Sequence, residues 1–143
     1  MNSFLNVTKA LADATRVRLL MATMERELSV CQVIALVRLA PSTVSKHMGI
    51  LGDAGLVQVR KDGRWAYYRA NQTARAAEVV KSGLAFARKM LANDETVVGD
   101  AVRIPGLPVM QIREGARPAH ARRRSRAQKR GDRTVAEKRR RGA

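Results

Sequence analysis

Apolar residues recur at helical spacing near the start of the chain. The segment after Asp13 carries apolar side chains at i, i+3, i+4 and i+7, namely Val17, Leu20, Met21 and Met24. This spacing places them on one face of a helix, and Asp13 is suited to cap its first turn. A shorter apolar stretch precedes Asp13 and predicts a first helix that ends near Ala12.

Two further short helices are predicted between residues 29 and 55. Ser29 and Gln32 form a capping-box pattern in front of an apolar helix of about nine residues. A three-residue break follows, and Pro41 then fits the first position of a new helix, because its φ is fixed and its amide hydrogen is missing. The inner face of this helix is formed by Val44, Met48 and Leu51, which leaves small polar and basic side chains outside.

Strand-like alternation follows these helices. Two runs, 56–61 and 64–69, flank the pair Asp62 and Gly63, and Asp-Gly between such runs is a strong hairpin signal. A loop at this pair places Val59 opposite Ala66. The order of elements is therefore helices, then a hairpin, then a last helix.

The last helix carries more apolar surface than one small domain can cover. Asn71 is suited to cap it, and its apolar stripe runs through residues 76–91. Small residues such as Gly83 along the stripe let another backbone approach closely. A two-fold partner supplies the missing cover, so we expect a homodimer.

Two short helices, a tight turn and a charged hairpin make a winged helix-turn-helix. The expected fold class is mainly α with a β-hairpin wing (α+β). The helix that begins at Pro41 fits the major groove of DNA, where hydroxyl groups reach base edges, while wing charges contact flanking phosphates. The expected DNA-binding residues are Pro41, Ser42, Thr43, Ser45, Lys46, His47, Arg60, Lys61 and Arg64. For His47 a purely structural role is the alternative.

The charge of the chain points to the same kind of partner. It carries 28 Lys and Arg against 12 Asp and Glu, a formal net charge of +16. So large an excess favours a polyanionic partner, nucleic acid ahead of an acidic membrane surface. Residues 1–102 hold 14 basic and 9 acidic side chains, whereas residues 103–143 hold 14 and 3. We expect a DNA-binding and dimerisation domain over 1–102 and a disordered basic tail over 103–143.

The tail has two interpretations. It either adds sequence-independent phosphate contacts or is a dispensable extension. The first of these supports an alternative function for the whole chain, a non-specific architectural or RNA-associated protein in which the tail dominates binding.

The sequence gives no support to enzyme activity. It holds no glycine-rich phosphate loop, no paired carboxylates in a helical or strand frame, and no nucleophile and base pair. Its single cysteine, Cys31, excludes a disulfide within the chain, and no signal peptide or membrane span is recognised. We expect a cytoplasmic protein without a membrane partner.

Five runs of the sequence resemble signatures of the ArsR/SmtB family of winged-helix repressors. They lie in family order and at family spacing, at residues 10–20, 27–31, 42–47, 51–57 and 63–69. The resemblance covers roughly residues 3 to 98. It implies a homodimer built on the first and last helices, which binds an inverted-repeat operator in double-stranded DNA and blocks transcription until an inducer releases it. The implied interface residues are Phe4, Leu5, Val79, Val80, Gly83, Leu84 and Ala87.

The family's usual sensing residues are only partly present. Classical members bind arsenite or soft metals through a Cys-x-Cys pair at the start of the third helix. Here the first of these positions is Ser29, and a hydroxyl is a poor ligand for a soft ion. Other members use Asp and His ligands on the last helix, but residues 71–92 contain no histidine.

Cys31 remains as the candidate sensor. It lies near the start of a helix whose dipole favours a thiolate. It is either a reactive thiol, which is oxidised, alkylated or bound to a soft metal or metalloid ion, or a partly buried small apolar residue. The sequence thus predicts a sequence-specific repressor of the ArsR type that a metal, metalloid or thiol-reactive inducer releases.

Overall fold

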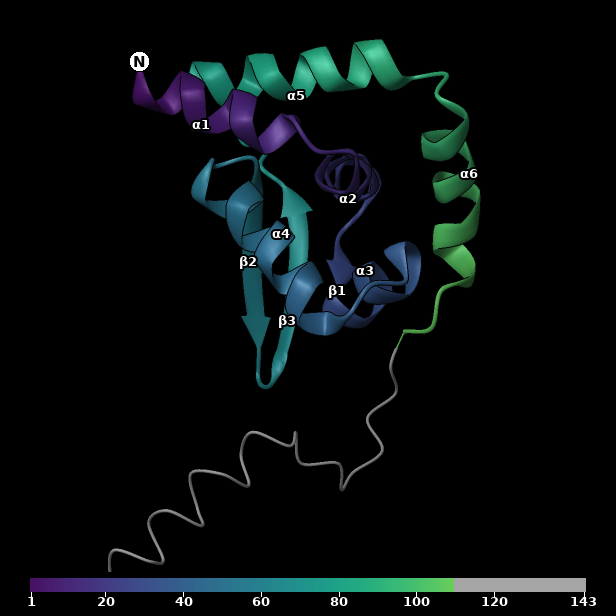
Figure 1. Cartoon of the computed structure of the whole chain (residues 1–143). Coiled ribbons are helices and arrows are strands. Elements are labelled where there is room, and N and C mark those ends of the chain that lie inside the picture. The colour runs from purple at the N-terminus through teal and green to yellow at the C-terminus, as the bar shows by residue number, and fades with distance from the viewer. Residues whose placement is uncertain (110–143) are drawn as a thin grey trace, which may run out of the picture. The chain divides into compact units, whose positions relative to one another are not determined.

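The computed structural model describes residues 1–109 of the chain (Figure 1). Within them the order of elements is α1 (Asn2–Leu11), α2 (Ala14–Glu25), β1 (Leu28–Ser29), α3 (Val30–Val37), α4 (Pro41–Asp53), β2 (Val57–Asp62), β3 (Trp65–Ala70), α5 (Glu78–Leu91), α6 (Glu95–Arg103) and the 3₁₀ turn η1 (Ile104–Gly106). The predicted helices and hairpin are confirmed. The sequence did not predict β1 or α6.

The predicted starts of α2 and α3 are confirmed. Asp13 accepts a hydrogen bond from the Arg16 amide at 2.9 Å. Ser29 and Gln32 form both bonds of the capping box, at 3.3 and 2.9 Å. Asn71, in contrast, does not cap the last helix. Its side chain donates to the carbonyl oxygen of Gly55 at 3.0 Å and ties the end of β3 to the end of α4.

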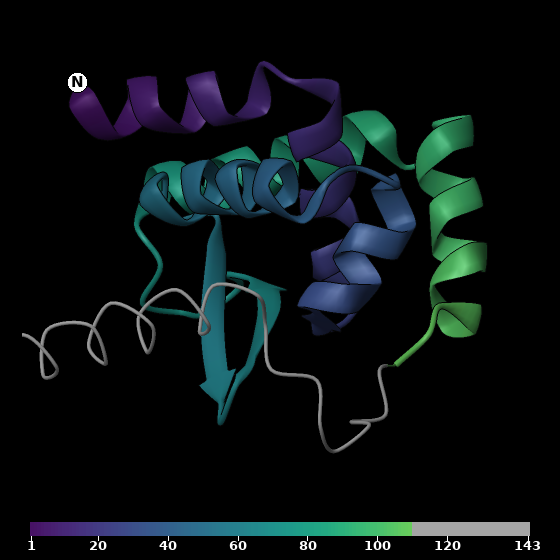
Figure 2. The same cartoon turned by 60° about the horizontal axis from the view of Figure 1, so that its bottom comes forward.

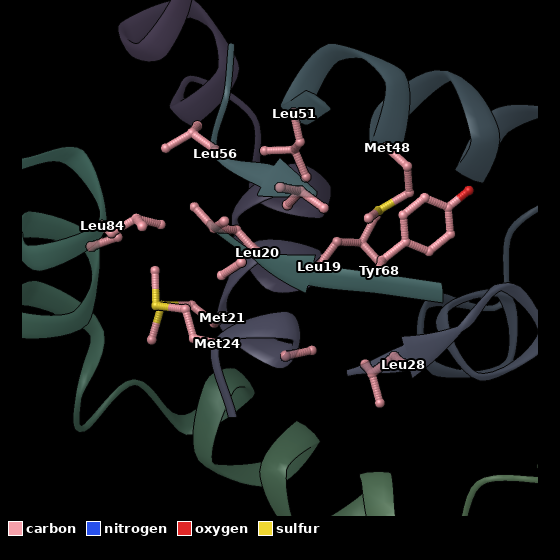
Figure 3. Packing of buried hydrophobic residues seen from close by; sticks show 14 of the residues in the cluster. Leu19, Leu20, Met21, Met24, Leu28, Met48, Leu51, Leu56, Tyr68 and Leu84 are labelled. Carbon is pink, nitrogen blue, oxygen red and sulfur yellow. The ribbon is translucent and has the colours of Figure 1, made fainter. Parts of the chain in front are cut away.

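The core is built around α2. Leu19 and Leu20 are fully buried there, and Figure 3 shows them between Met48 of α4, Tyr68 of β3 and Leu84 of α5. The sequence predicted one buried stripe on α2, yet Leu19 lies off that stripe. The difference arises because α2 is surrounded by α1, α4, α6 and β3, so more than one of its faces is covered.

The hairpin has the predicted faces but a different register. The sheet order is β1-β3-β2, and Val59 pairs with Tyr68 instead of Ala66. The two loop residues are Gly63 and Arg64, and of these only Gly63 has a positive φ, as glycine has at the first central position of a two-residue turn. A shift by two positions leaves every side chain on its predicted face. The hairpin projects from the helical body in both views (Figures 1 and 2).

Helices α1 and α5 pack against each other at close range. A Cβ atom at Gly83 would lie 2.9 Å from Cγ1 of Val7, so this crossing requires glycine. Helix α5 turns much of its apolar surface inward, so part of the predicted dimer interface is buried within the chain itself. The interface residues that pack instead in the core of the chain itself are Val80, Leu84 and Ala87.

Helix α6 crosses the predicted domain boundary at residue 102. Asp94 caps it by accepting the amides of residues 96 and 97 at 3.0 and 3.1 Å. Arg18 of α2 donates to both oxygens of the buried Asp100, at 2.8 and 2.9 Å, and Ile104 is buried beyond them. Residues 103–109 therefore belong to the folded part. The rest of the predicted tail lies outside the described residues.

Arg38, which ends α3, has the left-handed backbone conformation, with φ of 56° and ψ of 37°. A side chain with a Cβ atom is strained there. We expect Arg38→Gly to raise the free energy of unfolding by about 0.5–1 kcal/mol, measured by urea denaturation. Leu39→Gly is the control, because Leu39 has no positive φ and the change should be destabilising. Equal effects of the two substitutions would show that the backbone strain is negligible.

Candidate nucleic-acid interface

The first two turns of α4 present a polar, basic ridge. Pro41 occupies the first helical position, and no side chain caps the helix at Ala40. Val44 and Met48 are buried and hold α4 on the core. The exposed side chains of these turns, called the recognition ridge below, are Ser42, Thr43, Ser45 and Lys46.

His47 turns away from the recognition ridge. Its Nδ1 atom lies 3.8 Å from Oδ1 of Asp13 and is buried without a hydrogen-bond partner, and only 18% of the side chain is exposed. The hydrogen bond from the Arg16 amide, together with the charges of Arg16 and His47, lowers the pKa of Asp13. The structural interpretation of His47 therefore fits better than the predicted DNA contact, because the residue faces the start of α2.

The wing holds its three predicted cations in different surroundings. Arg60 donates to both oxygens of Glu27 at 2.6 and 3.2 Å, and its guanidinium lies 4.4 Å from the centre of the Tyr67 ring. Lys61 and Arg64 are exposed at the tip of the hairpin. Arg60 thus fastens the wing to the segment after α2, whereas Lys61 and Arg64 remain exposed at its tip.

The bonds from Arg60 lower the pKa of Glu27. A lowered pKa means that the pair stabilises the fold above the usual pKa of a glutamate and loses this effect as the pH falls through the lowered value. We expect Glu27→Gln to unfold at less urea than the parent at pH 7, and we expect this difference to shrink as the pH is lowered to 3. Glu78→Gln, at a side chain that is 85% exposed, should show no such convergence. A difference that is constant from pH 7 to pH 3 would contradict this role of Glu27.

Arg38, which lies in the three-residue break before Pro41, is a further candidate contact that the sequence did not predict. It is exposed and ends α3, three positions before the start of α4. Its positive charge and its place shortly before the predicted groove-binding helix could have indicated a DNA contact from the sequence alone.

Cys31 is the second residue of α3 and is half-buried. Burial raises the pKa of its thiol, which is opposite to the effect predicted from the helix dipole. Among residues 1–109, no three or more His, Cys, Asp and Glu side chains gather in a group suited to a metal ion.

Similarity to known proteins agrees with this geometry. Residues 13–59 match a family described as bacterial regulatory protein, arsR family. The arsenic resistance transcriptional regulator ArsR1 of Pseudomonas putida is 33% identical over 100 residues, which cover 68% of this chain and 74% of that protein. The HTH-type transcriptional regulator KmtR of Mycobacterium tuberculosis is 41% identical over 63 residues, covering 44% of this chain and 48% of KmtR.

Solved structures share the fold. HlyU from Vibrio cholerae superimposes with a TM-score of 0.54 at 24% sequence identity, over 64% of this chain and 95% of HlyU. The transcriptional repressor BigR from Xylella fastidiosa superimposes with a TM-score of 0.52 at 21% identity, over 64% and 85% of the two chains. No helix within residues 1–109 has the length and hydropathy needed to cross a membrane.

Proposed function

Since this chain is a DNA-binding transcriptional regulator of the ArsR/SmtB family, we propose that it represses transcription as a homodimer on an inverted-repeat operator and that an inducer acting at Cys31 releases it. The observation that carries the proposal is the recognition ridge. Its side chains are exposed on α4 while Val44 and Met48 bury the opposite face, beside a hairpin with cations at its tip. The protein acts in the cytoplasm, where its operator is.

On DNA, α4 enters the major groove with its N-terminal turns. The hydroxyls of Ser42, Thr43 and Ser45 are short enough to reach base edges, so they select sequence. Lys46, Lys61 and Arg64 contact phosphates, which fixes the orientation of the protein without reading bases. Arg38 joins this phosphate-binding set, and Arg60 holds the wing in place through Glu27.

Dimerisation uses α1 and the flank of α5 beside it. Phe4 and Leu5 leave 56% and 41% of their surface exposed on α1. Val79 and Gly83 lie on α5 and are half-buried, so a partner can still cover them. A two-fold axis through this surface would present two copies of α4 to successive major grooves.

A competition experiment tests DNA recognition. The protein is bound to labelled DNA from upstream of its own gene, and unlabelled random DNA is added in excess. We expect the complex to survive about a 1,000-fold excess, because specific sites are typically that much tighter than random ones. Displacement by an equal amount of random DNA would support the alternative of non-specific binding by the tail, which the similar regulators do not favour.

The inducer proposal rests on Cys31 as the one thiol of the chain. The relatives include a regulator named for arsenic resistance, and arsenite is a thiophilic species. We expect Cys31→Ser to bind the operator normally but to resist release by arsenite, Cd²⁺ and peroxide. The change is measured by fluorescence anisotropy of the labelled operator.

Met90→Leu is the matched control for Cys31→Ser, because peroxide also oxidises exposed methionine. It should be released like the parent. Unchanged release of Cys31→Ser by all three reagents would remove the thiol from the mechanism, while leaving DNA recognition by α4 intact.

A further inference from the structure

Helices α1, α2 and α4 meet at Asp13, in the short link between α1 and α2. Asp13 caps α2 by accepting the amide of Arg16 at 2.9 Å. The side chain of Arg16 donates to the carbonyl oxygens of Ala10 and Lys9, at 2.8 and 2.9 Å, and so closes the end of α1. His47 of α4 completes the junction, because its Nδ1 atom lies 3.8 Å from Oδ1 of Asp13. The junction therefore joins the helix proposed for dimerisation to the helix that carries the recognition ridge.

The contact between His47 and Asp13 leaves a polar atom unsatisfied. Nδ1 of His47 is buried without a hydrogen-bond partner, and 3.8 Å is too long for a hydrogen bond to Asp13. A buried polar atom without a partner destabilises the packing around it. The same distance suits an ion pair once the imidazole ring carries a proton. The proton therefore decides whether this contact weakens the packing of α4 on α2 or strengthens it.

We propose that His47 is a positioning residue for operator binding: with a proton on its ring it forms an ion pair with Asp13, which holds α4 in the orientation that the operator requires. This inference rests on the proposed repressor function and adds the proton to its control. Histidine is the side chain that ordinarily gains its proton between pH 8 and pH 5. Operator affinity should therefore rise as the pH falls through this range.

Asp13 is shared between two cationic side chains. The hydrogen bond from the Arg16 amide, together with the charges of Arg16 and His47, lowers the pKa of Asp13, so this group is a carboxylate over the whole range. Nη1 of Arg16 lies 3.8 Å from Oδ2 of Asp13, whereas Oδ1 is the oxygen closest to His47. The other guanidinium nitrogens of Arg16 that donate hydrogen bonds reach the end of α1. Oδ1 thus stays available to a proton on His47.

Within residues 1–109, Asp13 is the one carboxylate at ion-pair distance from His47. The elements packed against α4 are mainly α1, α2, α3 and β2. The charged side chains of these elements, with the residue that ends α3, are Lys9, Arg16, Arg18, Glu25, Arg38, Arg60, Lys61 and Asp62. Because most of these are cations, they oppose a proton on His47. The adjacent carboxylate of Asp13 is the group that favours it.

The expected size of the effect follows from the two copies of the contact in a dimer. Operator binding favours molecules in which α4 is already oriented for the groove, so a contact that holds α4 there raises the affinity. A partly exposed ion pair typically changes an equilibrium by about 1.5- to fivefold. The proposed dimer contains the pair twice, and both copies of α4 must fit the operator, so the two effects multiply.

A pH profile of operator binding tests the role of His47. The affinity of the full-length protein is measured by fluorescence anisotropy from pH 8 to pH 6 at constant ionic strength. We expect the parent to bind at least about threefold more tightly at pH 6 than at pH 8. His47→Gln should lose most of this difference. The chain has one other histidine, and His120→Gln is the matched control, which should behave like the parent.

Asp13→Asn tests the pair itself. Asparagine caps a helix as well as aspartate, so α2 keeps its cap while the charge opposite His47 is lost. We expect the pH dependence of operator affinity to disappear. Asp94→Asn makes the same change at the cap of α6, which is not an ion-pair partner of His47, and should keep the pH dependence of the parent. Circular dichroism at both pH values verifies that each variant is folded.

Two outcomes would overturn the positioning role. One is specific operator binding by the parent with the same affinity at pH 6 and pH 8. The other is a full pH dependence in Asp13→Asn, which would mean that a proton on His47 acts on the DNA directly. Both outcomes leave the repressor function intact, since the operator is still bound specifically. A lack of specific binding at every pH would instead overturn the repressor function, and this inference with it.

Discussion

If the proposed homodimer places α4 in the major groove, Ser45→Glu on the recognition ridge is expected to lower operator affinity at least about 100-fold, because a carboxylate would replace a small donor there and two copies of α4 would contact each operator. Ser45 is exposed, so the substitution should leave the fold intact. Glutamate is also a good helix former. The affinity is measured by fluorescence anisotropy with labelled operator, and the fold by circular dichroism.

Ser82→Glu is the matched control for this prediction. It makes the same chemical change at an exposed position of α5 and alters the net charge equally. We expect it to lower operator affinity by less than about threefold, through long-range repulsion alone. If both variants lose the same affinity, general charge and not the recognition ridge determines DNA binding.

Asp100→Leu is expected to lower the free energy of unfolding by about 2–3 kcal/mol, because it leaves the guanidinium of Arg18 without its partner. Arg18 keeps 28% of its side chain exposed, so water offsets part of the cost. Asp100 is buried and joins α6 to α2, so the same variant should also speed amide hydrogen exchange in α6. Urea denaturation gives the stability change.

The double variant Arg18→Met, Asp100→Leu distinguishes a lost partner from lost packing. Replacing a buried ion pair by apolar side chains of similar size is often neutral, so the double variant should recover most of the stability lost by Asp100→Leu. A loss below about 1 kcal/mol in the single variant would mean that the pair contributes little to holding α6.

Much of the fold follows from local patterns. The cap at Asp13 and the capping box of Ser29 and Gln32 involve residues three positions apart, and both are formed. The inner face of α4 follows from its helical period and is buried as predicted. The recognition ridge is predictable for the same reason, since a known buried face determines which side chains remain exposed.

The side-chain interactions that the sequence did not predict join residues that lie far apart along the chain. Arg18 and Asp100 are 82 positions apart, and Arg60 and Glu27 are 33 apart, so no local pattern indicates either pair. Because the sequence does not reveal the bond from Arg60 to Glu27, Arg60 was predicted to contact DNA only. His47 was assigned to DNA for the same reason, because its neighbour Asp13 belongs to another helix.

Register and element ends were predicted less well than element types. A two-residue strand, β1, has too few positions to show alternation. The hairpin loop moved by one residue because Gly63 takes the first central position of the turn, which the Asp-Gly pair alone does not specify. Asn71 has the chemistry of a cap, but it bonds to Gly55 across the fold, and α5 begins later.

Nuclease footprinting of the full-length protein on DNA from upstream of its gene tests the central claim most directly. The recognition ridge on a two-fold dimer predicts two protected half-sites, about 10 base pairs or a multiple of this distance apart. Protection should appear at both half-sites over the same range of protein concentration and be absent with Ser45→Glu. Uniform protection along the fragment, or paired half-sites that persist with Ser45→Glu, would contradict DNA recognition by α4.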